Sequence, residues 1–191
     1  MLDDGGTYYA VTRPRLFGKS IFLQMMASFF AGEQYRFVNS TLYKRGNSEV
    51  RGEWVKYPVI YLDFSAVNLK NCFTIDKFDT QLTSLQLKTA KKFELSYTSK
   101  NYNIWTMVQD LREKFENRGV VILIDEYDTP MLKYLKEGNK KFATKVRTYL
   151  NEFFAEIKAC ADNLKLVFVT GVSNLPLSSL GINLNIFKDL T

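Results

Sequence analysis

The sequence predicts an α/β domain built in layers, with a mainly parallel central sheet and helices packed against it. Short apolar segments of strand length alternate with longer segments of helical periodicity along the chain. One short segment, Val120–Ile124 (VVILI), is apolar without interruption, as expected for a central parallel strand that is buried on both faces. The length of 191 residues is that of one domain, so we expect residues 1–191 to form a single unit.

The spacing of apolar residues predicts the individual elements. Strands are expected where β-branched and aromatic residues dominate a short segment, and helices where apolar residues recur every three or four positions. The expected strands are 7–12, 59–64, 120–124 and 164–170, and the expected helices are 19–30, 75–93, 104–117 and 142–160. We expect loops over residues 40–56 and from Gly171 onward, where the chain is more polar. Because the chain begins at a strand and stops soon after another, we expect a domain that is truncated at both ends.

Composition excludes several classes of site. The chain has no histidine, which removes histidine metal ligands, histidine general bases and histidine-based triads. Cys72 and Cys160 lack a metal-binding spacing, and we expect free thiols in a reducing compartment. No apolar run approaches the roughly 20 residues that span a bilayer, and the N-terminus lacks the features of a signal peptide. We therefore expect a cytoplasmic protein without a membrane partner.

The net charge of +6 suits anionic partners such as nucleotides or nucleic acid. If the net charge is considered by itself, a basic surface that is exposed to solvent explains it more simply than an anionic partner does.

The turn between the first expected strand and the first expected helix has features of a phosphate-binding loop. Residues 12–20 read TRPRLFGKS, and their end matches the second half of the pattern GxxxxGK[ST]. We expect Gly18 to let the backbone approach phosphate oxygens, Lys19 to contact the β- and γ-phosphates, and Ser20 to ligate Mg²⁺. Arg13 stands where the pattern has its first glycine, and Pro14 removes one backbone donor. The alternative is an ordinary strand-to-helix turn with a surface lysine.

Acidic residues follow directly after the most apolar strand. Residues 120–128 read VVILIDEYD, which is the Walker B pattern. Ligands bind at the carboxyl ends of parallel strands, so Asp125 is expected to face the same site as the phosphate-binding loop and to hold Mg²⁺. Glu126 is expected to act as the general base that polarises the attacking water. The alternative is a strand that ends at a polar turn, with Asp125 capping the segment that follows.

A third strand ends in hydroxyl-bearing residues. In P-loop proteins with an Asp-Glu pair, such a strand lies between the two motif strands, and its terminal polar residue touches the γ-phosphate or the attacking water. Thr170 is the better candidate for this role, with Ser173 and Asn174 behind it. Thr170 and Ser173 could equally well only cap the loop.

Taken together, these segments resemble the AAA-ATPase-like domain family of P-loop NTPases. The matching segments are TRPRLFGKS, YPVIYLDF, VVILIDEYDTP, LVFVTGVS and SSLGINLN, in this order and over nearly the whole chain from Tyr8. RPRxFGK[ST] is this family's form of the Walker A loop, so an arginine at position 13 is expected from the resemblance. The resemblance implies the three-layer α/β sandwich of a P-loop NTPase. Members often carry a C-terminal nuclease-like domain of the PD-(D/E)xK type, which we do not expect within these residues.

The resemblance and the motifs together predict Mg²⁺-dependent ATP hydrolysis. The expected catalytic residues are Glu126, Lys19 and Thr170, and the expected Mg²⁺ ligands are Ser20 and Asp125. The expected nucleotide-binding residues are Arg13, Pro14, Arg15, Leu16, Phe17, Gly18, Lys19, Ser20 and Ile21. The two arginines either offset phosphate charge in place of the lost loop donors or pair with Asp128 or Glu126.

Two further functions stay open at this stage. The domain could bind nucleotide as a switch without meaningful turnover. It could also bind nucleic acid through a basic segment, although such a run more often forms a solvated helix face. The basic residues concerned are Lys133, Lys136, Lys140, Lys141, Lys145 and Arg147. A protein partner and assembly with further copies of the chain also stay open.

Overall fold

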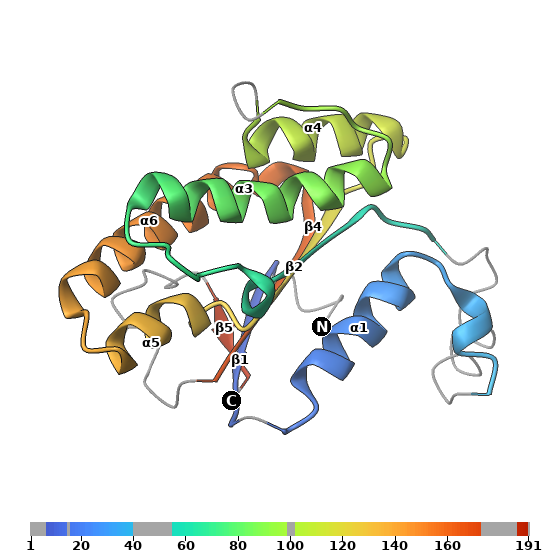
Figure 1. Cartoon of the computed structure of the whole chain (residues 1–191). Coiled ribbons are helices and arrows are strands. Elements are labelled where there is room, and N and C mark those ends of the chain that lie inside the picture. Colours follow the sequence, from blue (N-terminus) through green and yellow to red (C-terminus); the bar gives the residue numbers. More distant parts are fainter. Residues whose placement is uncertain (1–6, 15, 40–54, 99–101, 173–186, 191) are drawn as a thin grey trace.

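A five-stranded parallel sheet forms the centre of the fold (Figure 1). The computed structural model describes residues 7–14, 16–39, 55–98, 102–172 and 187–190. The strands are β1 (Tyr8–Thr12), β2 (Val59–Asp63), β3 (Val120–Asp125), β4 (Leu164–Gly171) and β5 (Lys188–Asp189), and their spatial order is β2-β3-β4-β1-β5. The predicted parallel sheet is thus confirmed, and β4 lies between β3 and β1 as expected.

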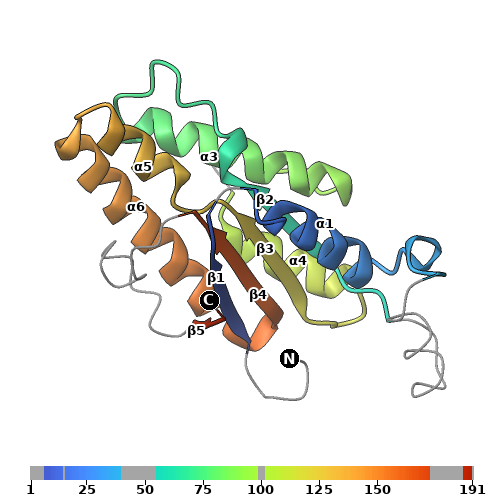
Figure 2. The same ribbon diagram turned by 90° about the horizontal axis from the view of Figure 1, so that it is seen from below.

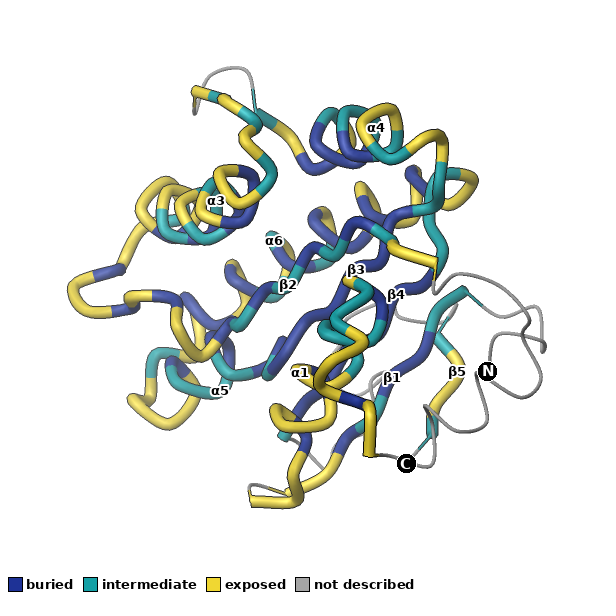
Figure 3. Tube along the Cα trace, turned by 90° about the vertical axis from the view of Figure 1, so that its right-hand side faces the viewer, coloured by how far each residue is buried: buried dark blue, intermediate teal, exposed yellow. Residues whose placement is uncertain are grey.

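Helices cover both faces of this sheet, which confirms the three-layer α/β sandwich of a P-loop NTPase. The helices are α1 (Lys19–Phe30), α3 (Ile75–Lys92), α4 (Ile104–Lys114), α5 (Thr129–Lys136) and α6 (Lys140–Ala159), with short 3-10 turns η1 (Gln34–Arg36), η2 (Phe64–Ala66) and η3 (Ala161–Asn163). Of these helices, α1 packs against one face, while α3, α4 and α6 lie on the other (Figures 1 and 3). The short helix α5 lies beside the start of α6 (Figure 2).

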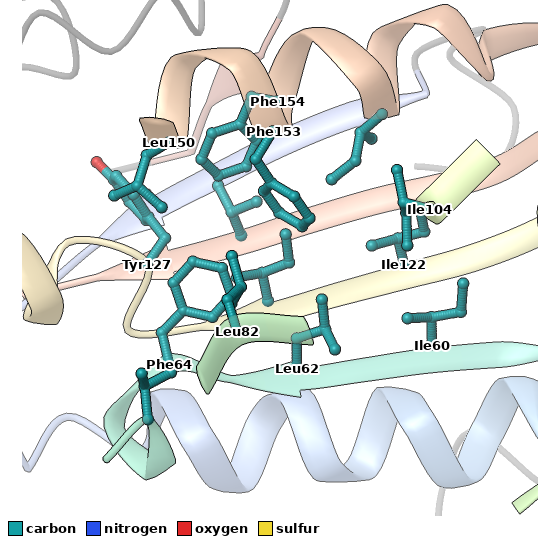
Figure 4. Packing of buried hydrophobic residues seen from close by; sticks show 14 of the residues in the cluster. Ile60, Leu62, Phe64, Leu82, Ile104, Ile122, Tyr127, Leu150, Phe153 and Phe154 are labelled. Carbon is teal, nitrogen blue, oxygen red and sulfur yellow. The ribbon is translucent and has the colours of Figure 1, made fainter. Parts of the chain in front are cut away.

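Strand residues alternate between the two faces, and each face has its own apolar core. On the face of α3, α4 and α6, Ile60, Leu62, Ile122 and helix residues such as Phe153 form a large buried cluster (Figure 4). On the opposite face, a smaller cluster joins Leu23 of α1 to strand residues. β3 is buried along its whole length because it contributes to both clusters, as its uninterrupted apolar sequence predicts.

The predicted strands and long helices agree with the structure to within a few residues at each end. The largest boundary difference is at the C-terminal end of the 104–117 prediction, where α4 stops at Lys114. The 59–64 strand ends at Asp63, whose side chain accepts from the backbone N–H of Ser65 at 2.9 Å and starts η2. α6 begins at Lys140, two residues before the predicted start, because Asn139 caps it by accepting from the N–H of Phe142.

One α-helix and one strand of the described ranges were not predicted. α5 begins directly after the acidic turn, has a proline in its first turn, and buries Met131 and Tyr134. The expectation of loop from Gly171 onward is wrong at Lys188–Asp189, which form β5 on the outer side of β1. This two-residue strand has no apolar alternation, and backbone pairing with Tyr9 and Ala10 defines it.

Cys72 and Cys160 are buried and unpaired, as expected of free thiols. Within the described ranges, no helix has both the length and the apolar content needed to cross a bilayer.

Candidate functional site

The phosphate-binding loop and the acidic turn lie at the same edge of the sheet. Thr12, at the end of β1, pairs with Gly171 at the end of β4, and Thr170 next to it donates a hydrogen bond to the carboxylate of Asp125 at the end of β3. Neighbouring strands are about 4.8 Å apart, so one intervening strand separates the ends of β1 and β3 by roughly 10 Å. The two motifs that the sequence singles out are therefore neighbours in space.

The loop before α1 folds around the side chain of Lys19. The Lys19 ammonium donates to the carbonyl oxygens of Arg13 at 2.7 Å and Pro14 at 2.9 Å, and the residue is only 8% exposed. Gly18 has a φ of 73°, in the left-handed region that glycine enters without steric cost, and it precedes the first turn of the helix. The loop thus places a lysine at the N-terminus of a helix, and main-chain carbonyl oxygens accept the hydrogen bonds of its ammonium group.

Apolar side chains are exposed around this loop. Leu16, Phe17, Ile21 and Met25 are all largely exposed, and Figure 3 shows the first turns of α1 mostly in the colour of exposed residues. Ser20 is exposed as well. A flat apolar group bound beside the phosphate-binding loop would therefore find apolar surface to cover.

The carboxylate of Asp125 is buried among neutral donors. Asp125 is 2% exposed and accepts hydrogen bonds from the hydroxyls of Thr170 and, at 3.4 Å, of Tyr61 in β2. Strand alternation puts all three side chains on the face that α1 covers. No lysine or arginine of the described ranges pairs with Asp125. A buried carboxylate without a nearby cation is costly, so this position fits a ligand for a divalent metal ion.

Glu126 adopts an unusual backbone conformation immediately after β3. Its φ is 50°, which is uncommon for a residue other than glycine, and its N–H donates to the Thr170 hydroxyl at 3.3 Å. Its carboxylate accepts from the Thr129 hydroxyl at 2.9 Å and is half-buried. The backbone bend ends the strand abruptly and places a second acidic residue directly after Asp125 in the chain, with its carboxylate oriented by the Thr129 hydroxyl.

Further contacts fasten the acidic turn to the end of β4. Asp128 is fully buried and accepts from the N–H of Val172 at 3.1 Å, and the N–H of Tyr127 donates to the carbonyl of Thr170 at 3.0 Å. A Cβ atom on Gly171 would lie 2.7 Å from the Tyr127 ring and 3.2 Å from the Asp128 carboxylate. Glycine is therefore required at position 171 for this close approach. The carbonyl of Gly171 also accepts from the N–H of Arg13 at 3.3 Å, which connects the turn to the phosphate-binding loop.

The remaining candidate residues are only partly described. Arg13 is exposed and forms no ion pair within the described ranges, so the alternative in which it pairs with Asp128 or Glu126 is not seen. Arg15, Ser173 and Asn174 lie outside the described residues.

Sequence reasoning missed Tyr61 and Gly171 as parts of the site. Tyr61 lies two positions before Asp63 on β2, and β2 pairs with β3 so that Asp63 is level with Asp125. Burial, followed by the charges of Asp125 and Asp63, raises the pKa of Tyr61, so its hydroxyl keeps the proton that it donates. The alternation of a short strand could have indicated which face Tyr61 occupies, but its level relative to Asp125 depends on the strand register.

Comparison with known proteins bears on this arrangement. Residues 1–181 match the family described as “Predicted AAA-ATPase”. A protein of Azotobacter chroococcum mcd 1, described as “Uncharacterized protein in vnfD 5'region”, is 26% identical over 191 residues, which is the whole of this chain and 35% of that protein. The chain thus spans about a third of the length of this curated relative. No solved structure matches the chain.

Proposed function

Because the chain belongs to the AAA-ATPase-like family, we propose that it binds ATP with Mg²⁺ and hydrolyses the γ-phosphate. One observation carries this proposal: the loop of Lys19 and the buried carboxylate of Asp125 lie at one sheet edge, joined through the end of β4. A triphosphate with its metal ion needs cationic and backbone donors on one side and a carboxylate on the other. The nucleotide base would contact the exposed apolar side chains of Leu16, Phe17 or Ile21.

Phosphate binding falls to the loop and the first turn of α1. Lys19 would exchange its bonds to the carbonyls of Arg13 and Pro14 for bonds to the β- and γ-phosphate oxygens. The free N–H groups at the start of α1 favour negative charge at that point, and Gly18 keeps side-chain atoms out of the way. The guanidinium groups of Arg13 and Arg15 would offset the remaining phosphate charge.

Mg²⁺ would be held by Ser20 and Asp125 together with phosphate oxygens and water. Proteins usually supply only one or two ligands to Mg²⁺ bound with nucleotide, so a complete cage of side chains is not needed. The described residues contain no group of three or more metal-binding side chains of His, Cys, Asp or Glu. The bound ion would supply the positive charge that Asp125 lacks among its neighbours and would neutralise charge on the phosphates.

Glu126 would act as the general base. Its carboxylate takes a proton from a water molecule whose oxygen forms a bond to the γ-phosphorus, while the bond from that phosphorus to the bridging oxygen breaks and ADP leaves with the electron pair. Thr129 orients the Glu126 carboxylate, and Thr170 bonds the Asp125 carboxylate and the backbone N–H of Glu126, where it would be close to the γ-phosphate. The competing function is a nucleotide switch in which binding occurs without meaningful turnover.

Calorimetric titration of ATP with Mg²⁺ tests the binding step. The wild-type chain should bind, and Lys19→Ala should bind on the order of 10- to 100-fold more weakly, because a charge-assisted bond contributes about 1.5–3 kcal/mol. Lys140→Ala removes an exposed lysine of α6 and should bind like wild type. Absence of binding to wild type, or equal binding by Lys19→Ala, would overturn the proposal.

Phosphate release under saturating ATP separates the ATPase from the switch. Glu126→Gln keeps the size of the side chain and should reduce turnover by about 10²- to 10⁴-fold while leaving ATP affinity close to wild type. If wild type and Glu126→Gln release phosphate at the same slow rate and both bind ATP, the protein is a switch and not an ATPase.

A further inference from the structure

A groove lies beside the connection that leads from β2 to α3. Its volume is about 300 Å³, and it is lined by Asn68, Lys70, Asn71, Cys72, Lys77, Thr80 and Gln81. Apart from the buried Cys72, the lining consists of amide, hydroxyl and ammonium side chains and includes no carboxylate. Lys70 and Lys77 are exposed and form no ion pair within the described ranges. Such a lining suits an oxyanion that accepts several hydrogen bonds.

An exposed aromatic ring adjoins the groove. Phe73 follows the lining residue Cys72 in the chain and is 61% exposed. The main chain at this point is held in place, because the Tyr134 hydroxyl of α5 donates to the carbonyl of Cys72 at 2.7 Å. The ring is exposed, Lys70 and Lys77 flank it in the chain, and the carbonyl of the preceding residue is bonded to a packed helix, so the ring offers a face on which a planar group can stack.

The surroundings of the groove are basic as well. Figures 1 and 2 both show the β2–α3 connection, α5 and the start of α6 at the same end of the molecule. Over residues 67–81 and 129–141 the lysines are Lys70, Lys77, Lys133, Lys136, Lys140 and Lys141, and the carboxylates outside the core are Asp76, Asp79 and Glu137. Asp79 already accepts a hydrogen bond from Tyr149 at 2.5 Å. Positive charge therefore predominates around the groove and would attract a polyanion.

We propose that this groove binds single-stranded nucleic acid, with a backbone phosphate between Lys70 and Lys77 and an adjacent base stacked on Phe73. Phosphate and base alternate along a nucleic acid strand. Lys70 and Lys77 would bind the phosphate, and Phe73, which lies between them in the chain, would stack on the base. A duplex would not suit it, because the faces of paired bases are covered by their neighbours. An acidic polypeptide would use the lysines but would have no base to stack on the ring.

The groove is distinct from the proposed ATP site, although both belong to the same sheet edge. β2 leads into the groove through η2, and β3 leads through the acidic turn into α5, which holds Cys72. Binding of nucleic acid requires none of the residues assigned to ATP. The two proposals can therefore fail separately.

Fluorescence anisotropy with a labelled oligothymidylate, measured without ATP over a series of salt concentrations, tests this site. Wild type should bind with an affinity that falls as salt rises. The double variant Lys70→Ala/Lys77→Ala should bind more weakly, and its slope of log K against log salt should be smaller by about 0.7, the value for one lost phosphate contact on a single strand. Phe73→Ala should weaken binding about tenfold and leave the salt slope unchanged, and Phe73→Trp should restore binding.

A charge-matched control lies at the opposite end of α3. Lys91→Ala/Lys92→Ala removes two exposed lysines of the same helix and should bind like wild type. Three outcomes would overturn the proposal: equal loss in both double variants, which indicates general charge attraction; wild-type affinity of Phe73→Ala; or competition by duplex DNA or polyglutamate as effective as that by unlabelled oligothymidylate. Circular dichroism of each variant checks that the fold is retained.

Discussion

The two halves of the proposed ATP site are built in different ways. The described residues of the phosphate-binding loop are largely exposed, and their polar contacts include the bond from the N–H of Arg13 to Gly171 and the bonds from Lys19 to the carbonyls of Arg13 and Pro14. The acidic turn after β3 is buried, and Asp125, Glu126 and Asp128 are all bonded to the end of β4. The loop can release its lysine to a ligand at little cost, whereas the turn holds its carboxylates in place before any ligand arrives.

This difference suggests a division of labour. The carboxylates expected to take part in the chemistry belong to the acidic turn after β3, which is hydrogen-bonded to the end of β4. Such a network holds them in position before the ligand binds, as pre-organisation requires. Groups that first meet the nucleotide lie on a segment whose contacts are easily exchanged. The predictions that follow change one position of the rigid half at a time, in order of decreasing expected effect.

Replacing Asp125 should have the largest effect on metal-dependent binding. In Asp125→Asn, the gain in ATP affinity that Mg²⁺ provides should fall roughly 100-fold, or about 3 kcal/mol, because the carboxylate is expected to ligate the ion. Without nucleotide, the variant should be at least as stable as wild type, since it removes a buried charge that has no cation beside it. Titrations with and without Mg²⁺, together with urea denaturation, measure both effects.

Asp63→Asn is the matched control for this experiment. Asp63 occupies the same level as Asp125 on the neighbouring strand, but it is bonded to the N–H and hydroxyl of Ser65. Its replacement should leave the Mg²⁺-dependent gain intact. Equal loss in both variants would mean that general negative charge, and not ligation by Asp125, attracts the ion.

Gly171→Ala should destabilise the fold. The added Cβ would lie 2.7 Å from the buried ring of Tyr127, so the ring, the acidic turn or β4 must shift. Overpacking of this kind costs about 1–3 kcal/mol, which chemical denaturation can resolve. Gly138→Ala is the comparison, because there the Cβ has nothing within 4 Å and only the positive φ of 76° opposes it. A cost at position 171 no greater than at 138 would show that the turn is less tightly packed than the structure indicates.

Thr170→Val should weaken the rigid half without a change in side-chain shape. The variant loses the bond to the Asp125 carboxylate and the bond from the N–H of Glu126, which together contribute about 2–3 kcal/mol. Turnover should fall by more than ATP affinity, because the Asp125 carboxylate and the backbone of Glu126 lose their bonds to position 170 while the loop is intact. Thr170→Ser should restore turnover. If Val and Ser variants turn over alike, the hydroxyl has no role in positioning.

The sequence predicted the elements in which apolar residues form a continuous run or recur at regular spacing over a long segment. The five-residue apolar run of β3 and the helical spacing of α3 and α6 reflect burial directly, and burial decides these elements in the structure as well. α5 spans only eight residues, too few for its period to stand out. β5 is held by backbone bonds to β1, such as that from the N–H of Leu190 to the carbonyl of Ala10 at 2.9 Å, and side-chain patterns carry no record of such bonds.

The candidate site shows the same limit. The loop motif and the rule that ligands bind at the carboxyl ends of parallel strands were enough to bring Lys19 and Asp125 to one edge. The contributions of Tyr61 and Gly171 depend on the register between strands that are far apart in the chain, since a shift of one residue would turn Tyr61 to the other face. Sequence therefore located the segments of the site but not the contacts that hold its carboxylates.

Tyr61→Phe should have the smallest effect of the series. The bond from its hydroxyl to Asp125 measures 3.4 Å, at the long end of the range, and Asp125 keeps its bond to Thr170 in the variant. The free energy of unfolding should change by less than about 1 kcal/mol, and Mg²⁺-dependent ATP affinity by less than about fivefold. Wild type, Tyr61→Phe, Thr170→Val and the double variant form a double-mutant cycle, in which titration measures ATP affinity and denaturation measures the free energy of unfolding. If the two residues hold the same carboxylate, the double variant should lose more than the sum of the single losses, because Asp125 is then left without either donor.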